Sequence, residues 1–238
     1  LALALDRAGD RAGEREALEK SIALDPKLAL PQNQIGLLDL QDGNLAKAEG
    51  ELKNALSLDP QYAEAQNNLG VLYGRLGRNQ EAEKLFRQAV EDNPQYAQAF
   101  VNLGLTLASQ NRFPEANKEL ETAIGIAPSN ASALTALGMV EARMGKMDDA
   151  IRRFRRVIEL TPGEPEAHLN LGIALADHLD LEGALAEFSE AARLRPGSSA
   201  AHYNRGRGWY DVRRNEEAKM ELRLAVQLDP RSGRRINL

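Results

Sequence analysis

Apolar residues recur along this chain in two alternating sets with three- and four-residue spacing. One set includes Ala82, Phe86, Ala89 and Val90, and the same spacing returns at Ala150, Phe154, Val157 and Ile158. The other set starts from a leucine-like residue and has a second position four residues later, at 35 and 39, 69 and 73, 103 and 107, 137 and 141, and 171 and 175. Such spacing places side chains on one face of a helix. The pattern therefore predicts alternating amphipathic helices.

The helical pattern repeats every 34 residues without an insertion or deletion. Proline marks the period at Pro26, Pro60, Pro94, Pro128, Pro162, Pro196 and Pro230. Glycine follows at Gly36, Gly70, Gly104, Gly138, Gly172 and Gly206, and alanine at Ala48, Ala82, Ala116, Ala150, Ala184 and Ala218. A period of this length is typical of a chain built from copies of one supersecondary unit.

Each unit is predicted to be a helix, a turn and a second helix. Breaks near Gly43, Gly77, Asn111 and Gly145 indicate the end of the first helix. Proline ends the second, because it disfavours helix in the residue before it and has no N–H to donate. Six glycines within helices would cost roughly 6 kcal/mol relative to alanine, so close helix packing must offset that cost. We expect the bare Cα to let the second helix approach, with the small alanine twelve residues later filling the gap.

The unit boundaries follow from the period. A unit that begins three residues after each proline gives six full copies, at 29–62, 63–96, 97–130, 131–164, 165–198 and 199–232. Residues 1–28 match the last positions of an earlier copy, and 233–238 form an overhang. We therefore expect a single solenoid over 1–232, in a chain that is a piece of a longer protein.

The unit resembles the tetratricopeptide repeat (TPR). The copy 63–96 reads AEAQNNLGVLYGRLGRNQEAEKLFRQAVEDNPQY, with the leucine–glycine pair, the alanine, the Phe or Leu four residues later and the proline of that family. The resemblance covers residues 1–232. The copies lack the family's leading Trp, and Arg205 replaces the leucine in the last copy. The resemblance implies an all-α fold, an α-α superhelix of antiparallel helix pairs whose first helices line a concave groove.

On the predicted groove, two rows of residues recur from copy to copy. Asparagine precedes the leucine–glycine pair at Asn68, Asn102, Asn170 and Asn204, and an aliphatic row follows at Leu37, Val71, Leu105, Met139 and Ile173. A carboxamide can donate to and accept from a peptide unit. The row is thus similar to the asparagine ladder in the superhelix of O-linked N-acetylglucosamine transferases. Two interpretations stay open: the asparagines bind an extended ligand, or they brace neighbouring repeats.

The last copy is the least regular and supplies the other candidate ligand residues. Its groove positions include Tyr203, Arg207 and Tyr210, which could contact an anionic or aromatic group. Cations elsewhere on this face are Arg75 and Arg143. The face carries no lysine, so it does not match the carboxylate clamp of the family's chaperone-tail readers. The irregularity can also belong to a terminal repeat on which nothing packs.

The amino-acid composition and net charge disfavour several classes of function. Of the residues, 43% are hydrophobic and 5% aromatic, and 30 basic against 35 acidic residues give a formal charge of -5. That balance disfavours nucleic acid, and no apolar run is long enough for membrane insertion. Without cysteine there is no thiolate chemistry, and we find no catalytic pair, cofactor motif or metal set. Location is left open, with the cytoplasm favoured.

We interpret the chain as a non-enzymatic scaffold for protein–protein interaction that binds a protein or extended peptide in its groove. One alternative is the substrate-recruiting TPR region of a larger enzyme such as a glycosyltransferase. Another is a module that self-associates through the ends of the repeat array, where apolar faces would be left uncovered.

Overall fold

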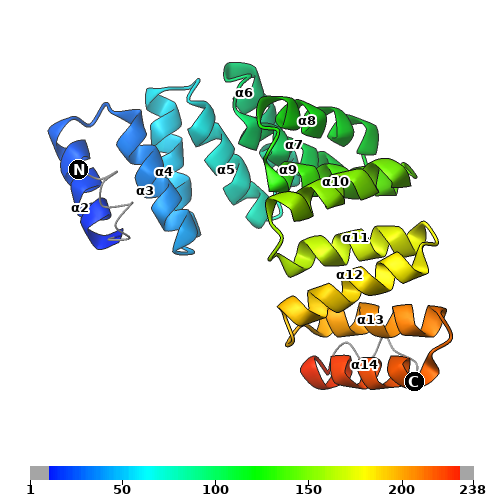
Figure 1. The fold of residues 1–238 in the computed structure, drawn as a ribbon. Coiled ribbons are helices and arrows are strands. Elements are labelled where there is room, and N and C mark those ends of the chain that lie inside the picture. Colours follow the sequence, from blue (N-terminus) through cyan, green and yellow to red (C-terminus); the bar gives the residue numbers. More distant parts are fainter. Residues whose placement is uncertain (1–10, 231–238) are drawn as a thin grey trace. The chain divides into compact units, whose positions relative to one another are not determined.

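The computed structural model describes residues 11–230, and all regular structure in that range is α-helical (Figure 1). The helices are α2 (Arg11–Leu24), α3 (Ala29–Gln41), α4 (Leu45–Leu58), α5 (Ala63–Arg75), α6 (Asn79–Asp92), α7 (Ala97–Ser109), α8 (Phe113–Ile126), α9 (Ala131–Arg143), α10 (Met147–Leu160), α11 (Pro165–Asp177), α12 (Leu181–Leu194), α13 (Ser199–Asp211) and α14 (Asn215–Leu228). The prediction of an all-α fold of helix pairs is confirmed.

The helices form antiparallel pairs that are connected by short turns, in two compact units (Figure 1). The first unit is 1–128, with α2 to α8 in its described part, and the second is 129–238, with α9 to α14. Each unit is a stack of helix pairs. The expectation of one continuous solenoid over 1–232 stays a prediction, and the overhang 233–238 lies outside the described residues, as does the start of the partial copy 1–28.

Each first helix approaches its partner most closely at the repeated glycine. A Cβ atom added to Gly104 would lie 2.6 Å from Cγ of Leu120, and one added to Gly172 would lie 2.6 Å from Cε1 of Phe188. Both side chains are buried. The residue that fills the space is therefore the Phe or Leu sixteen residues after the glycine. The expected alanine, Ala116 in the third full copy, is buried as well, and it meets this Cβ position with its carbonyl oxygen at 3.3 Å.

The turn within each pair uses one residue in the left-handed region. Gly43, Gly77 and Gly145 have φ of 79°, 74° and 76°, and the same place in the other copies is taken by Asn111, Leu179 and Arg213, also with positive φ. The next residue donates back to the helix, as Arg78 N–H does to the carbonyl of Tyr73 at 2.9 Å. This is the Schellman arrangement that satisfies the last carbonyls of a helix.

The repeated proline ends each second helix through the residue before it. Asp59 and Asn93, which precede Pro60 and Pro94, have extended backbones with φ of -136° and -134°. Proline imposes this conformation on its predecessor by steric contact. The proline carbonyl then accepts a hydrogen bond from the next first helix, as Pro60 does from Nε2 of Gln66 at 2.8 Å.

Replacing Gly104 by alanine should destabilise the fold, whereas the same change at Gly50 should not. The new Cβ in G104A would overlap the buried Leu120, and overpacking of this kind costs about 1–3 kcal/mol, more than the roughly 1 kcal/mol that alanine gains in a helix. Gly50 lies within α4 in the same unit, with nothing within 4 Å of its added Cβ, so G50A should be neutral or stabilising. Urea unfolding measures both, and equal stabilities would contradict the packing role.

Candidate functional site

The candidate residues lie on the face of the first helices turned away from their partner helices. Asparagines 68, 102, 170 and 204 are all half-buried there. One turn along, the aliphatic row is open to solvent at Leu105, Met139 and Ile173, which are 44%, 52% and 42% exposed. We call this surface the open face. It combines amides with exposed aliphatic groups, so it can contact both a peptide backbone and an apolar side chain.

In the first unit, the amides of the open face form one hydrogen-bonded chain. Asn102 Nδ2 donates to Asn67 Oδ1 at 2.7 Å, linking α7 to α5, and Asn68 Nδ2 donates to Asn33 Oδ1 at 3.0 Å, linking α5 to α3. Asn67 Nδ2 joins the two links by donating to Asn68 Oδ1 at 3.5 Å. Gln98 extends this series of hydrogen bonds at one end by donating to Asn102, and Tyr62 extends it at the other end by accepting from Asn33.

Through these hydrogen bonds, Asn68 and Asn102 brace neighbouring repeats. Their partners Asn33 and Asn67 are 2% and 3% exposed, so an unpaired amide there would be costly. The asparagine row alone did not reveal Asn33 and Asn67 as the partners of Asn68 and Asn102. The signal was present, because each pair consists of an amide and a second amide 35 residues earlier.

In the second unit the asparagines lack such partners. The residue 35 positions before Asn170 is Thr135, whose hydroxyl donates to the carbonyl of Ala131 in its own helix at 2.8 Å. No hydrogen bond to the Asn170 side chain occurs among residues 11–230. Asn204 donates to the carbonyl of Ala200, one turn earlier in α13, at 2.9 Å. Neither asparagine side chain therefore braces the neighbouring repeat.

The two candidate arginines have different surroundings. Arg75, at the end of α5, donates through Nη1 to the carbonyl of Leu40 near the end of α3, at 2.9 Å. It thus links two repeats and satisfies a carbonyl at a helix C-terminus. Arg143 is exposed at the end of α9 in the second unit.

The structure brings several of the last-copy candidates together on α13. Asn204 and Arg207 line a small cavity of about 30 Å³ with Ile173, Asp177 and Asp211. Tyr210, on the same helix, is 66% exposed, and Tyr203 is half-buried. The second unit therefore presents an amide, an arginine and two carboxylates around an aliphatic side chain, with two tyrosines on the same helix as the amide.

Arg205 points into the repeat and away from the open face. Its Nη2 lies 2.5 Å from Oε1 of Glu221 on α14, and the buried ring of His202 lies between Glu221 and the carbonyl of Pro196, with both distances 2.8 Å. Burial alone would raise the pKa of the Glu221 carboxyl, but hydrogen bonds from Arg205 and His202 outweigh burial and lower that pKa. Arg205 is thus an internal ion-pair partner in place of the family leucine.

Other charged groups are consistent with a solvated surface. In the arginine run of α10, Arg152 pairs with Asp149, Arg153 with Glu141 and Arg156 with Glu159. Within residues 11–230, no three His, Asp or Glu side chains are grouped so as to hold a metal ion. No helix in the same range combines the length and apolar character that crossing a bilayer requires.

Models of the tetratricopeptide repeat family match residues 27–92, 70–131 and 135–199. The chain belongs to the TPR family. As a TPR protein it is a scaffold for protein interaction. A sequence search of curated proteins finds no match.

Solved structures resemble the chain over most of its length. YrrB, a TPR protein with an unusual peptide-binding site, is 27% identical with a TM-score of 0.64, and the match covers 79% of this chain and 96% of YrrB. MamA is 26% identical with a TM-score of 0.62, covering 68% and 95%. PilF of Pseudomonas aeruginosa, at 24% identity and a TM-score of 0.75 over 85% and 92%, shares the fold.

Asn102 and Asn170 occupy the same repeat position, so their alanine variants form a matched pair. N102A should lower the unfolding free energy of the TPR chain by about 1–3 kcal/mol, because the buried Oδ1 of Asn67 loses its donor. N170A should change it by less than about 0.5 kcal/mol, since that side chain braces nothing. Urea unfolding measures both. A stable N102A variant would argue against the amide chain as a brace.

The Glu221 carboxylate should stabilise the TPR fold at neutral pH and lose that effect in acid. Because its pKa is lowered by folding, its contribution is present above the ordinary carboxyl pKa and disappears as pH falls through the folded pKa. E221Q should therefore be less stable than the native chain by about 1–3 kcal/mol near pH 7, and the difference should shrink towards about pH 3.

Urea unfolding across this pH range measures the difference. Glu216→Gln is the control, because Glu216 is 82% exposed and pairs only with Lys219 of its own helix. A difference that does not change with pH would rule out the lowered pKa as its cause.

Proposed function

We propose that the open face of α9, α11 and α13 in the second unit binds an extended peptide segment of a partner protein. The observation that carries the proposal is the free carboxamide of Asn170, which lies in the same helix as the exposed Ile173. A free amide can match the N–H and C=O of one peptide unit. An exposed aliphatic side chain beside it can cover an apolar residue of the same ligand.

Other residues on the open face of the second unit favour a ligand that is mostly polar and has some apolar groups. Met139 repeats the exposed aliphatic position on α9, and Tyr210 offers an exposed ring on α13. Arg207, Asp177 and Asp211 supply charges of both signs around the small cavity. Side chains such as tyrosine and arginine commonly contribute most of the energy in protein interfaces.

The first unit has a different part in this proposal. Asn68, Asn102 and Arg75 hold its repeats together, so a ligand would have to replace hydrogen bonds already made. We therefore place the ligand on Asn170, Asn204, Tyr203, Arg207, Tyr210 and Arg143. The substrate-recruiting and self-association alternatives stay predictions.

A selection of random dodecapeptides displayed on phage, followed by fluorescence polarisation, tests this proposal. The combined change N170A and I173S should weaken the selected peptides at least about tenfold, which corresponds to about 1.4 kcal/mol. The change L105S, at the position of Ile173 but on α7, serves as the control and should leave affinity unaltered. Peptides that bind the combined variant as tightly as the native chain would show that the site lies elsewhere.

A further inference from the structure

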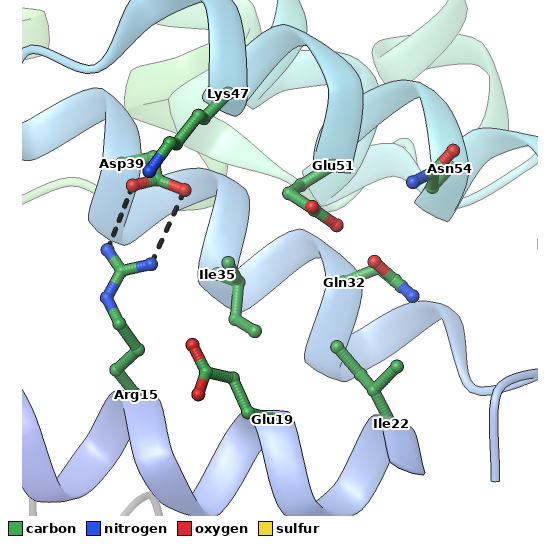
Figure 2. A pocket seen from close by; sticks show the side chains of 9 residues that line it. All are labelled: Arg15, Glu19, Ile22, Gln32, Ile35, Asp39, Lys47, Glu51 and Asn54. Atoms are coloured by element: carbon green, nitrogen blue, oxygen red, sulfur yellow. Dashed lines mark hydrogen bonds and ion pairs between the residues drawn. The ribbon is translucent and has the colours of Figure 1, made fainter.

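A second cavity lies in the first unit (Figure 2). It measures about 530 Å³, is open to solvent and is bordered by α2, α3 and α4. Its lining residues are Arg15, Glu19, Ile22, Gln32, Ile35, Asp39, Lys47, Glu51 and Asn54. On α3, Ile35 and Asp39 lie roughly half a turn around the helix from Leu37, which belongs to the aliphatic row of the open face. The volume suits a small ligand or one inserted side chain.

One end of the cavity is already matched in charge. Arg15 Nη2 lies 3.0 Å from Oδ1 of Asp39 and 3.5 Å from Oδ2 of Asp42, and Arg11 pairs with Asp42 at 3.0 Å. Figure 2 shows Lys47 at this same end, beside Asp39. The cations of the cavity are therefore gathered around the aspartates.

The other polar lining residues are Glu19, Gln32, Glu51 and Asn54, of which the first three supply acceptors. The charge of Glu19 already acts on the Arg15 guanidinium, without a direct ion pair. Neither carboxylate of Glu19 and Glu51 has a hydrogen bond or ion pair among residues 11–230. Gln32 is only 9% exposed, and its Oε1 has no hydrogen-bond partner. A buried amide oxygen in this state has a cost that a donor from a ligand would remove. Glu19 and Glu51 reach the cavity from α2 and α4, with Ile35 between them in Figure 2.

In the next repeat a larger side chain occupies the position of Asp39. The position of Asp39 is taken there by Tyr73, which is 5% exposed and donates to Oε1 of Glu49 at 3.1 Å. The guanidinium of Arg78 covers its ring at 3.7 Å. The residue corresponding to Gln32 is Gln66, whose Nε2 is held by Asp92 and Pro60 at 2.6 and 2.8 Å, while its Oε1 is buried without a partner, as in Gln32. The smaller Asp39 leaves the first cavity open.

We propose that this cavity binds an organic cation on a short aliphatic stem. Glu19, Glu51 and the Gln32 carbonyl would accept its N–H donors, and charge-assisted hydrogen bonds of this kind are the stronger ones. Ile22 and Ile35 would cover the stem, as aliphatic surfaces do for arginine and lysine. An anion is disfavoured, because Arg15 is paired with Asp39 and Lys47 lies beside the same aspartate in Figure 2. The cation is either a basic side chain of a partner protein or a free alkylamine.

Amide NMR titration of the whole chain tests the proposal with three probes. N-acetyl-argininamide should cause saturable shifts in α2, α3 and α4, and N-acetyl-citrullinamide, its uncharged counterpart, should bind at least about tenfold more weakly because it lacks the ionic bonds. Putrescine represents the free amine. Tighter binding of argininamide assigns the site to a basic side chain, and tighter binding of putrescine assigns it to a free amine.

Variants locate the binding. E19Q and E51Q should each raise the dissociation constant at least about fivefold, since each removes one charged acceptor. E121Q should leave it unchanged, because Glu121 has the position of Glu19 on α8 of the same unit. Circular dichroism checks that all three fold. Absence of saturable shifts, equal binding of the citrulline probe, or full binding by both E19Q and E51Q would each overturn the proposal.

Discussion

The fold depends on one steric constraint, the close approach of two helices over a bare Cα. At Gly36, Gly70 and Gly138 an added Cβ would lie 2.7 to 2.8 Å from the side chain of the partner helix, too close for any real contact. The left-handed turn residue and the extended residue before each proline set the ends of the helices. They thereby keep the glycine of each repeat opposite the Phe or Leu sixteen residues later. A constant 34-residue period preserves this contact in every copy.

Because the glycine face of each first helix is fixed against its partner helix, the residues on the open face also have fixed neighbours. Because the register never changes, residues 34 or 35 positions apart meet across neighbouring first helices, as Asn33 meets Asn68 and Asn67 meets Asn102. A residue type that recurs at the repeat period therefore forms a row across neighbouring first helices. Side chains on that surface either hydrogen-bond to each other and stiffen the stack or stay available for a ligand.

The sequence was sufficient to predict the helix pairs, since spacing, glycine, turn and proline all indicate the same unit. It was not sufficient to assign the asparagines, because their role depends on a partner 35 residues away that lies outside the leucine–glycine motif. Arg205 shows the same limit: the sequence shows only that it replaces the family leucine, and the position of Glu221 on α14 reveals the internal pair. The cavity beside Gln32 depends on the small Asp39, whose effect on volume no periodicity shows.

One neighbour therefore separates the asparagines that brace the stack from those that do not. Where the residue 35 positions earlier is an amide, as at Asn33 and Asn67, the asparagine is used within the stack. Thr135 and Leu169 hold that position for Asn170 and Asn204, and neither supplies an acceptor across the helices. A carboxamide that the fold leaves unpaired can bind a peptide without first breaking a bond between repeats. Selection for a rigid stack and selection for a binding face can thus act on the same repeat position in different copies.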